Sequence, residues 1–219
     1  ILIGLVGSEM CIRDRYKHKK QSGGGGQYGD VEIVFEPSGD MTTPYIFEEQ
    51  IFGGAVPKQY FPAVEKGLQE CVKAGPLAGY PVVGIKATLV DGSYHPVDSN
   101  EVSFKMAAVG AFKEAFKKAK SAIMEPINTV EVVVPDSYTG DVMGDLNKRR
   151  GRILGMEAKG GKQHITAEVP AYEMIKYATD LRSMTQGRGE FTMEFTRFEE
   201  APHDVQEHVI AKRKSLVEG

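Results

Sequence analysis

Apolar and polar residues alternate between positions 31 and 36, and this alternation predicts a strand with one buried face. Val31, Ile33 and Phe35 fall on one side, while Glu32 and Glu36 fall on the other. The run Pro-Ser-Gly-Asp at 37–40 predicts a turn after this strand. Two further strands are expected in the same half of the chain, over 45–50 and 82–90.

Helical spacing predicts two helices in the first half. The first runs over 57–74 and ends at Gly75 and Pro76. The second begins at Asp98, which we expect to be its N-cap, with Glu101 completing a capping box. We expect this second helix to turn one apolar face inward, formed by Val102, Met106, Val109, Phe112 and Phe116.

The second half alternates strands and helices in the order βαββαβ, which is the ferredoxin-like pattern. Strands are expected over 127–134, 153–158 and 164–169, followed by a last strand that contains Phe191, Met193 and Phe195; helices are expected over 139–150 and 172–184. Because this rhythm starts after Glu125-Pro126, we place a domain boundary near Met124.

The N-terminal residues follow neither period. Residues 6–15 resemble translated sequencing-adapter sequence, so we expect 1–15 to be a non-native tail outside the fold; the alternative is a genuine N-terminal strand. The expected organisation is a tail at 1–15, a first domain at 16–123, a second at 124–201, and a C-terminal helix and tail at 202–219.

Composition excludes several classes of protein. Of 219 residues, 41% are hydrophobic and 26% are charged, as in an ordinary globular protein and unlike a disordered or collagen-like chain. Lys+Arg number 27 and Asp+Glu 30, so a binding site for nucleic acid would have to be local. Two cysteines form no disulfide or metal pattern, and no apolar run reaches the roughly 20 residues that span a bilayer. We therefore expect a cytoplasmic protein that binds no metal and no membrane.

A glycine-rich stretch at 23–29 contains the spacing Gly24-x-Gly26-x-x-Gly29. This spacing occurs in dinucleotide sites, but here it precedes a strand and opens no helix, so no helix N-terminus is present to hold a pyrophosphate. Two interpretations remain: a flexible linker, or a loop whose backbone approaches another surface closely. In the second case Lys17, Lys19, Lys20 and Gln21 could contact phosphates.

Two further features are candidates for contacts with RNA. His95 lies in the loop 92–98 and is either simply solvated or part of a stackable tip. Residues 148–152 hold four cations, which either complement a helix dipole or bind phosphate. The sequence contains no Gly-x-x-x-x-Gly-Lys-Ser/Thr nucleotide motif, and no nucleophile–base set has supporting context.

Five co-linear motifs together resemble the elongation factor G family. They are Lys19-Lys20-Gln21-Ser22-Gly23-Gly24 through Gly29, Ala74 through Val82, Gly92 through Ser99, Gly140 through Gly151, and Tyr177 through Gly189. The resemblance covers about residues 17–213 and implies a two-domain α+β and α/β fold. An α/β domain with a left-handed crossover, similar to domain IV, would precede a ferredoxin-like domain similar to domain V.

The resemblance also implies the functional residues. The tip loops that contact the ribosome and its RNA would consist of Gln21, Ser22, Gly23, Gly24, Gly25, Gly26, Gln27, Tyr28, Ser93, Tyr94 and His95. Basic contacts would come from Lys17, Lys19, Lys20, Lys148, Arg149, Arg150 and Arg152. No residue would be catalytic.

The implied partners are the ribosome, ribosomal RNA and the tRNA–mRNA complex in the A site. The chain would act as a monomer that helps translocation, with domain V on the large subunit. It would hold no cofactor, because GTP and Mg²⁺ would bind a GTPase domain outside it. Gly25 and Pro96 depart from the common family pattern and are similar to a second, elongation-factor-G-like group. The alternatives are a tetracycline-resistance ribosomal protection protein and an enzyme that holds a nucleotide in the Gly-rich loop.

Overall fold

The computed structural model describes residues 2–5, 11–20, 25–41, 43, 45–119 and 121–217, without the side chains of 5 and 214–217. The chain divides into two compact units. Unit 1 comprises Ile1–Ile123 and Glu200–Gly219, and unit 2 comprises Met124–Glu199. The mixed α/β content and the two units agree with the fold class predicted from the sequence.

Unit 1 is built on a sheet of strand order β2-β3-β6-β4. Its strands are β2 (Ile12–Lys20), β3 (Gln27–Pro37), β4 (Tyr45–Glu49) and β6 (Ile85–Ser93). β3 is antiparallel to both β2 and β6, whereas β4 and β6 are parallel. Because parallel neighbours need a crossover connection, the chain leaves the sheet between β4 and β6 and returns through a helix.

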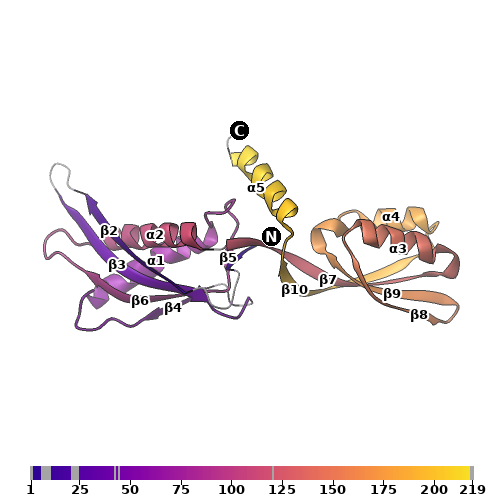
Figure 1. The fold of residues 1–219 in the computed structure, drawn as a ribbon, viewed down its shortest axis with the longest axis horizontal. Helices are drawn as coiled ribbons and strands as arrows, with labels where there is room; N and C mark the ends of the chain where they lie inside the picture. Colours follow the sequence, from indigo (N-terminus) through magenta and orange to yellow (C-terminus); the bar gives the residue numbers. More distant parts are fainter. Residues whose placement is uncertain are drawn as a thin grey trace. The chain divides into compact units, whose positions relative to one another are not determined.

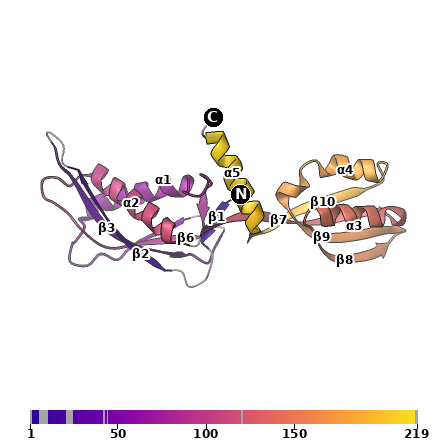
Figure 2. The ribbon, with the colours of Figure 1, turned by 45° about the horizontal axis from the view of Figure 1, so that its top comes forward.

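Two helices, α1 (Phe61–Lys73) and α2 (Glu101–Lys118), cover one face of this sheet, as Figures 1 and 2 show. The alternation predicted for β3 is confirmed, since Val31, Ile33 and Phe35 are buried in the core beneath the helices. The opposite face of the sheet carries charged side chains, among them Arg15 and Glu32. One layer of helices and one sheet therefore enclose the core of unit 1.

The predicted start of α2 is wrong, and its predicted buried face is correct only in part. Its N-cap is Asn100, whose side chain accepts a hydrogen bond from the Ser103 N–H, while the Ser103 hydroxyl accepts one from the Asn100 N–H. The exposed fractions of Val102 and Met106 are 56% and 43%. Phe112 and Phe116 are buried as predicted, and the rest of the buried face is rich in alanine, formed by Phe104, Ala107, Ala108, Ala111 and Ala115. Small side chains allow α2 to approach the sheet and α1 closely.

The exclusion of residues 1–15 from the fold is also corrected by the structure. Ile12–Arg15 form the first part of β2 and pair with β3, and the Asp14 carboxylate is buried beside the Lys118 ammonium at 2.8 Å. β1 (Leu2–Leu5) is parallel to β5 (Val82–Val83) and buries Ile3. The inward-facing Asp14 is charged, like its outward-facing neighbours Arg13 and Arg15. Residues 12–15 therefore lack the apolar–polar alternation that predicts a strand. The non-native origin of these residues stays a prediction.

Unit 2 has the predicted ferredoxin-like order. Its strands are β7 (Ser121–Pro135), β8 (Arg152–Lys159), β9 (Lys162–Pro170) and β10 (Glu190–Glu200), and its helices are α3 (Thr139–Lys148) and α4 (Tyr177–Met184). β9 lies between β8 and β7, and β10 also pairs with β7. Val130, Val132 and Ile165 are buried in the core of this unit.

Two details of unit 2 differ from the sequence analysis. The helix predicted over 172–184 is divided into a 3₁₀ turn, η3 (Ala171–Met174), and α4. Lys176 separates them in the left-handed conformation with φ of 65°, which an α-helix does not accommodate. In β10, Phe191 packs on the core, but Met193 and Phe195 are exposed.

The C-terminal helix α5 (His203–Val217) belongs to unit 1 and is no separate segment. Its apolar residues Val205, Val209 and Ile210 pack against the core of unit 1. The Gln206 side chain accepts a hydrogen bond from the Ile123 N–H at 3.0 Å and donates one to the Ala201 carbonyl at 2.8 Å. Packing between residues far apart in sequence therefore decides where this helix lies.

Candidate nucleic-acid interface

The structure brings the two predicted tip loops together at one end of the β2-β3-β6 sheet. The Tyr28 N–H donates to the Asp98 carbonyl at 2.9 Å, and the Ser99 hydroxyl donates to the Tyr28 carbonyl at 2.8 Å. Residues 25–28 and 93–99 thus form one continuous surface, which we call the tip surface. Gln21, Ser22, Gly23 and Gly24 lie outside the described residues.

Two glycines allow this close approach of the loops and the start of α2. A Cβ on Gly26 would overlap the carboxyl group of Asp98, and a Cβ on Gly29 would lie 2.5 Å from the Ser103 carbonyl oxygen. Gly25, in contrast, has no atom within 4 Å of the position a Cβ would take, among those described. Gly26 and Gly29 are therefore needed for packing within the chain, and the approach of the stretch to another surface stays a prediction.

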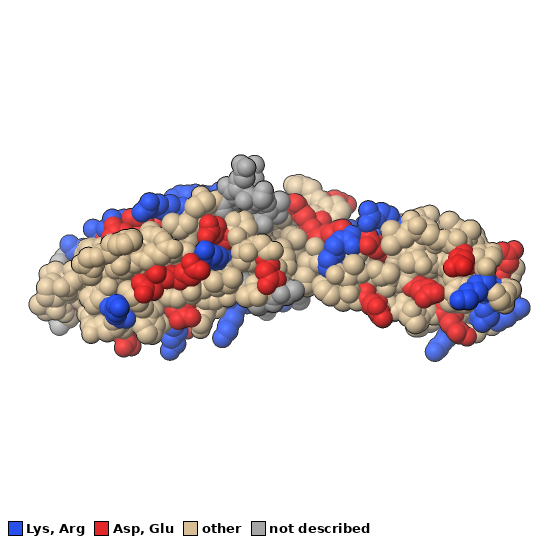
Figure 3. All heavy atoms as spheres, turned by 90° about the horizontal axis from the view of Figure 1, so that it is seen from below, with Lys and Arg blue, Asp and Glu red and all other residues tan. Residues whose placement is uncertain are grey.

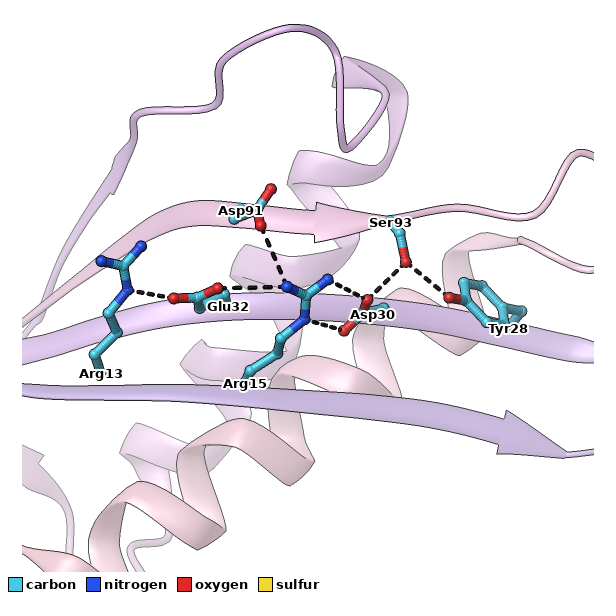
Figure 4. Close-up of polar contacts among 7 residues, drawn as sticks. All are labelled: Arg13, Arg15, Tyr28, Asp30, Glu32, Asp91 and Ser93. Carbon is cyan, nitrogen blue, oxygen red and sulfur yellow. Dashed lines mark hydrogen bonds and ion pairs between the residues drawn. The ribbon is translucent and has the colours of Figure 1, made fainter.

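A chain of polar contacts joins the tip surface to the middle of the sheet (Figure 4). The Ser93 hydroxyl donates to the Asp30 carboxylate at 2.6 Å, so the Tyr28 hydroxyl is the donor in its 2.7 Å contact with Ser93. Arg15 then donates two hydrogen bonds to the same carboxylate, at 3.0 and 2.7 Å. Because β2, β3 and β6 all contribute, the network fixes these strands relative to one another where the tip surface begins.

The electrostatics of Asp30 reflect this arrangement. The residue is fully buried, and burial by itself would raise the pKa of its carboxyl. The hydrogen bonds from Arg15 and Ser93 outweigh burial and leave the pKa lowered. The same bonds to Asp30 raise the pKa of the Arg15 guanidinium. The two groups form a permanent ion pair at neutral pH.

The cations of β2 differ in how they are engaged along the strand. Arg13 pairs with Glu32, and Arg15 pairs with Asp30 and, at 3.3 Å, with Asp91. Lys17 lies over the Tyr28 ring, 5.7 Å from its centroid. The remaining two cations, Lys19 and Lys20, follow at the tip end of the strand and are exposed. Figure 3 shows basic and acidic side chains mixed over the face it presents, so we expect a positive field to be confined to this end of β2.

The loop after β6 presents a run of exposed side chains. Tyr94, His95 and Val97 have exposed fractions of 48%, 50% and 83%, the value for His95 referring to its side chain. The Tyr28 and His95 rings are tilted neighbours with centroids 6.2 Å apart. Gln27 is less available, because its side-chain oxygen is 2.9 Å from the His18 ring. An aromatic, a histidine and nearby lysines are the residue types that RNA-binding surfaces use.

The basic cluster of unit 2 is engaged mostly inside the unit. Arg149 bonds to the carboxylates of Asp145 and Asp180, at 2.7 and 2.6 Å. Arg150 bonds to the buried Glu125 at 2.6 Å. The other two cations are Arg152, which pairs with Glu168, and Lys148, which is exposed at the end of α3. Arg149 and Arg150 therefore act first as structural ties, and the prediction of a free phosphate-binding patch does not describe them.

Three residues that shape or support the tip surface are not predicted as part of it. Arg15 is expected in a tail and Asp98 at a helix cap, although Asp98 contacts Tyr28 and His95. Asp30 is not among the predicted residues. Asp30 lies on the charged face of β3 with Glu32, and its burial becomes evident only when its neighbours Arg15 and Ser93 are known.

Two classes of site have no candidate among the residues that the structure describes. No group of three or more His, Cys, Asp or Glu side chains there is placed to hold a metal ion. Likewise, none of the described helices is long and apolar enough to cross a bilayer.

Comparisons with known proteins identify the family. The model described as elongation factor G, domain IV, matches residues 9–120, and the model described as elongation factor G C-terminus matches residues 122–209. The chain belongs to the elongation factor G family. The resemblance seen in the sequence is thereby confirmed, and the domain IV match includes residues 12–15 of β2, which the sequence analysis places outside the fold.

A solved structure extends the comparison. A crystal structure of a protein from Thermus thermophilus is 40% identical, with a TM-score of 0.82. The match covers 98% of this chain and 31% of that one, so this chain spans about a third of the length of that protein. Unit 1 thus corresponds to domain IV of elongation factor G, and unit 2 corresponds to its C-terminal domain.

Proposed function

We propose that this chain is the part of a ribosomal translocase that reaches the decoding side of the A site. The tip surface would contact the tRNA–mRNA complex, and unit 2 would contact ribosomal RNA of the large subunit. The observation that carries the proposal is the tip surface itself, where Tyr94 and His95 are exposed. The exposed Lys19 pairs in the sheet with Tyr28, whose ring neighbours that of His95.

The proposed action is mechanical. Gly26 and Gly29 let the two loops pack tightly, and the Arg15–Asp30–Ser93 network holds the loops on the sheet. A tip held in this way can occupy a site and block backward movement of RNA without a proton-transfer step. Cations at its base would bind phosphates whatever the codon, since phosphate contacts carry no sequence information.

The described part of the Gly-rich stretch does not fit a GTP phosphate site. Described residues 25 and 26 of the Gly-rich stretch lead directly into β3, so no helix N-terminus follows the glycines. We propose that GTP and Mg²⁺ bind to a GTPase domain of the longer protein, outside this chain. We further propose that the chain works in the cytoplasm as a monomer.

The experiment is a comparison of charge removal at two places. The double variant Lys19→Ala/Lys20→Ala is measured for binding to bacterial 70S ribosomes over a series of salt concentrations. We expect weaker binding and a salt slope smaller by about 1.5–2, because two phosphate contacts are lost. The control Lys66→Ala/Lys73→Ala removes the same charge from the exposed side of α1. Equal slopes for the two variants would refute the assignment of the tip.

A further inference from the structure

The chain passes between the two units at two places. Unit 2 comprises Met124–Glu199, so one connection leaves unit 1 after Ile123 and the other returns at Glu200. Ile123 and Ala201 are buried in the core of unit 1, and the Ala201 N–H donates to the Ile123 carbonyl at 2.9 Å. The two connections are therefore held against each other where they join unit 1.

The side chain of Gln206 completes this contact between the connections. Because one connection leaves unit 1 and the other returns, they run in opposite directions, and facing residues of an antiparallel ladder can exchange both N–H···O=C bonds. Here the second bond is replaced. The Ile123 N–H donates to Gln206 Oε1 at 3.0 Å, and Gln206 Nε2 donates to the Ala201 carbonyl at 2.8 Å. We call these two hydrogen bonds the Gln206 bridge.

The Gln206 bridge needs a side chain that both donates and accepts. A backbone N–H only donates and a backbone C=O only accepts, so the amide oxygen must face Ile123 and the amide nitrogen must face Ala201. A carboxylate would only accept, and an ammonium would only donate. Nε2 also lies 3.4 Å from the Glu200 carboxylate. The partners of the carboxamide therefore fix its orientation.

The helix α5 places this carboxamide at the connections. Gln206 lies in the first turn of α5, and its N–H donates to the Pro202 carbonyl at 2.9 Å. Side chains of a helix lean toward its N-terminus, which here is the end beside Ala201. Val205 and Val209 pack against the core of unit 1 and hold the helix in position. Helix geometry and core packing thus direct the amide to the two connections.

We propose that Gln206 is a positioning residue that fixes the direction in which both connections leave unit 1. Hinge motion is absorbed by residues at the ends of elements, and Ala201 is such a residue, between β10 and α5. The Gln206 bridge must break before Ala201 can turn away from Ile123. The inference concerns motion between the units and does not rest on the proposed function.

The test compares motion between the units in the wild type and in Gln206→Met, a side chain of similar length that makes neither bond. Residual dipolar couplings of the weakly aligned full chain give an alignment magnitude for each unit. Units that move together share one magnitude, whereas motion between them makes the two magnitudes differ. We expect Gln206→Met to enlarge this difference and to speed hydrogen exchange of the Ile123 amide about tenfold, because both bonds are lost.

Two control variants leave the Gln206 bridge intact. Gln69→Met removes a carboxamide from the exposed side of α1, where it bonds to Glu65. Val209→Ala weakens the packing of α5 on the core without removing either bond of the bridge. We expect both variants to keep the wild-type difference between the alignment magnitudes.

Gln206→Glu separates the two ends of the bridge. The carboxylate still accepts from the Ile123 N–H but no longer donates to the Ala201 carbonyl. We expect exchange of the Ile123 amide to stay slow, while the difference between the alignment magnitudes grows as it does in Gln206→Met.

Three outcomes would overturn the inference. An unchanged difference between the magnitudes in Gln206→Met, even with faster exchange at Ile123, shows that the bridge does not control the connections. An equal increase in Val209→Ala assigns that control to the attachment of α5. Wild-type behaviour of Gln206→Glu shows that the bond to Ala201 is not needed. None of these results bears on the ribosome-binding comparison, which tests the proposed function separately.

Discussion

Gly29 packs against the backbone of Ser103 so closely that a Cβ on residue 29 would lie 2.5 Å from the Ser103 carbonyl oxygen. Ser103 is the buried N3 residue of the α2 capping box. The contact therefore joins β3, immediately after the Gly-rich stretch, to the first turn of the helix that follows the His95 loop. Residue 29 must be glycine because a larger residue would overlap the first turn of α2, a helix that begins 72 positions later in the chain, at Glu101.

A graded series of alanine substitutions tests this packing. We expect Gly29→Ala to lower the free energy of unfolding by about 2–3 kcal/mol, because backbone atoms must move to relieve the overlap. Gly26→Ala should cost less, about 1 kcal/mol, since the Asp98 side chain is able to turn away. Urea denaturation of each variant measures both values.

Gly25→Ala is the matched control for this series. A Cβ at that position meets no described atom within 4 Å, so we expect stability within about 0.5 kcal/mol of the wild type. A Gly29→Ala variant as stable as Gly25→Ala would contradict the close approach of β3 to α2.

Asp30 is expected to make stability depend on pH. Its folded-state pKa is lowered, so its contribution is fully present above the unfolded pKa of about 3.9 and is lost as pH falls through the folded value. Asp30→Asn should destabilise the chain at neutral pH by about 1–3 kcal/mol. The difference between wild type and variant should shrink as the pH falls below about 4.

The measurement is chemical denaturation of both proteins at a series of pH values. Glu70→Gln serves as a comparison, because Glu70 is an exposed carboxylate on α1 whose pKa is also lowered by a hydrogen bond, here from Lys105. We expect only a small effect from that surface pair. A pH-independent difference for Asp30→Asn would show that its carboxylate charge does not stabilise unit 1.

Arg150 is expected to matter for the stability of unit 2. Hydrogen bonds to Glu125 raise the pKa of its guanidinium, and Glu125 is buried. Arg150→Ala leaves that carboxylate unpaired and should cost about 2–3 kcal/mol. Adding Glu125→Gln should recover part of the loss, because the remaining buried group is then neutral.

Arg152→Ala is the control for charge. Its side chain is 68% exposed, and Arg197 still pairs with Glu168 after the change. We expect an effect below about 0.5 kcal/mol in thermal or urea denaturation. If Arg150→Ala were as mild as Arg152→Ala, the role of Arg150 as a structural tie would be wrong.

Elements that depend on local patterns can be predicted without the structure. The alternation of Val31, Ile33 and Phe35 predicted a half-buried strand, and the βαββαβ order predicted the ferredoxin-like unit. The five motifs are sufficient to indicate the elongation factor G family without any contact between side chains in the folded chain. Periodicity and short motifs can be recognised in the sequence because each depends on residues that are only a few positions apart.

Which groups meet depends on contacts between residues that are far apart in the chain. Asn100 rather than Asp98 caps α2. Asp98 instead contacts β3, where its carbonyl accepts a hydrogen bond from the Tyr28 N–H. Arg15 donates hydrogen bonds to Asp30 and Asp91 on the neighbouring strands. These residues are 15 and 76 positions away in the chain. The sequence pattern allows Arg150 to bind phosphate, but in the folded chain its guanidinium pairs with the carboxylate of Glu125. Burial, pairing and close approach arise between distant residues, so no local pattern encodes them.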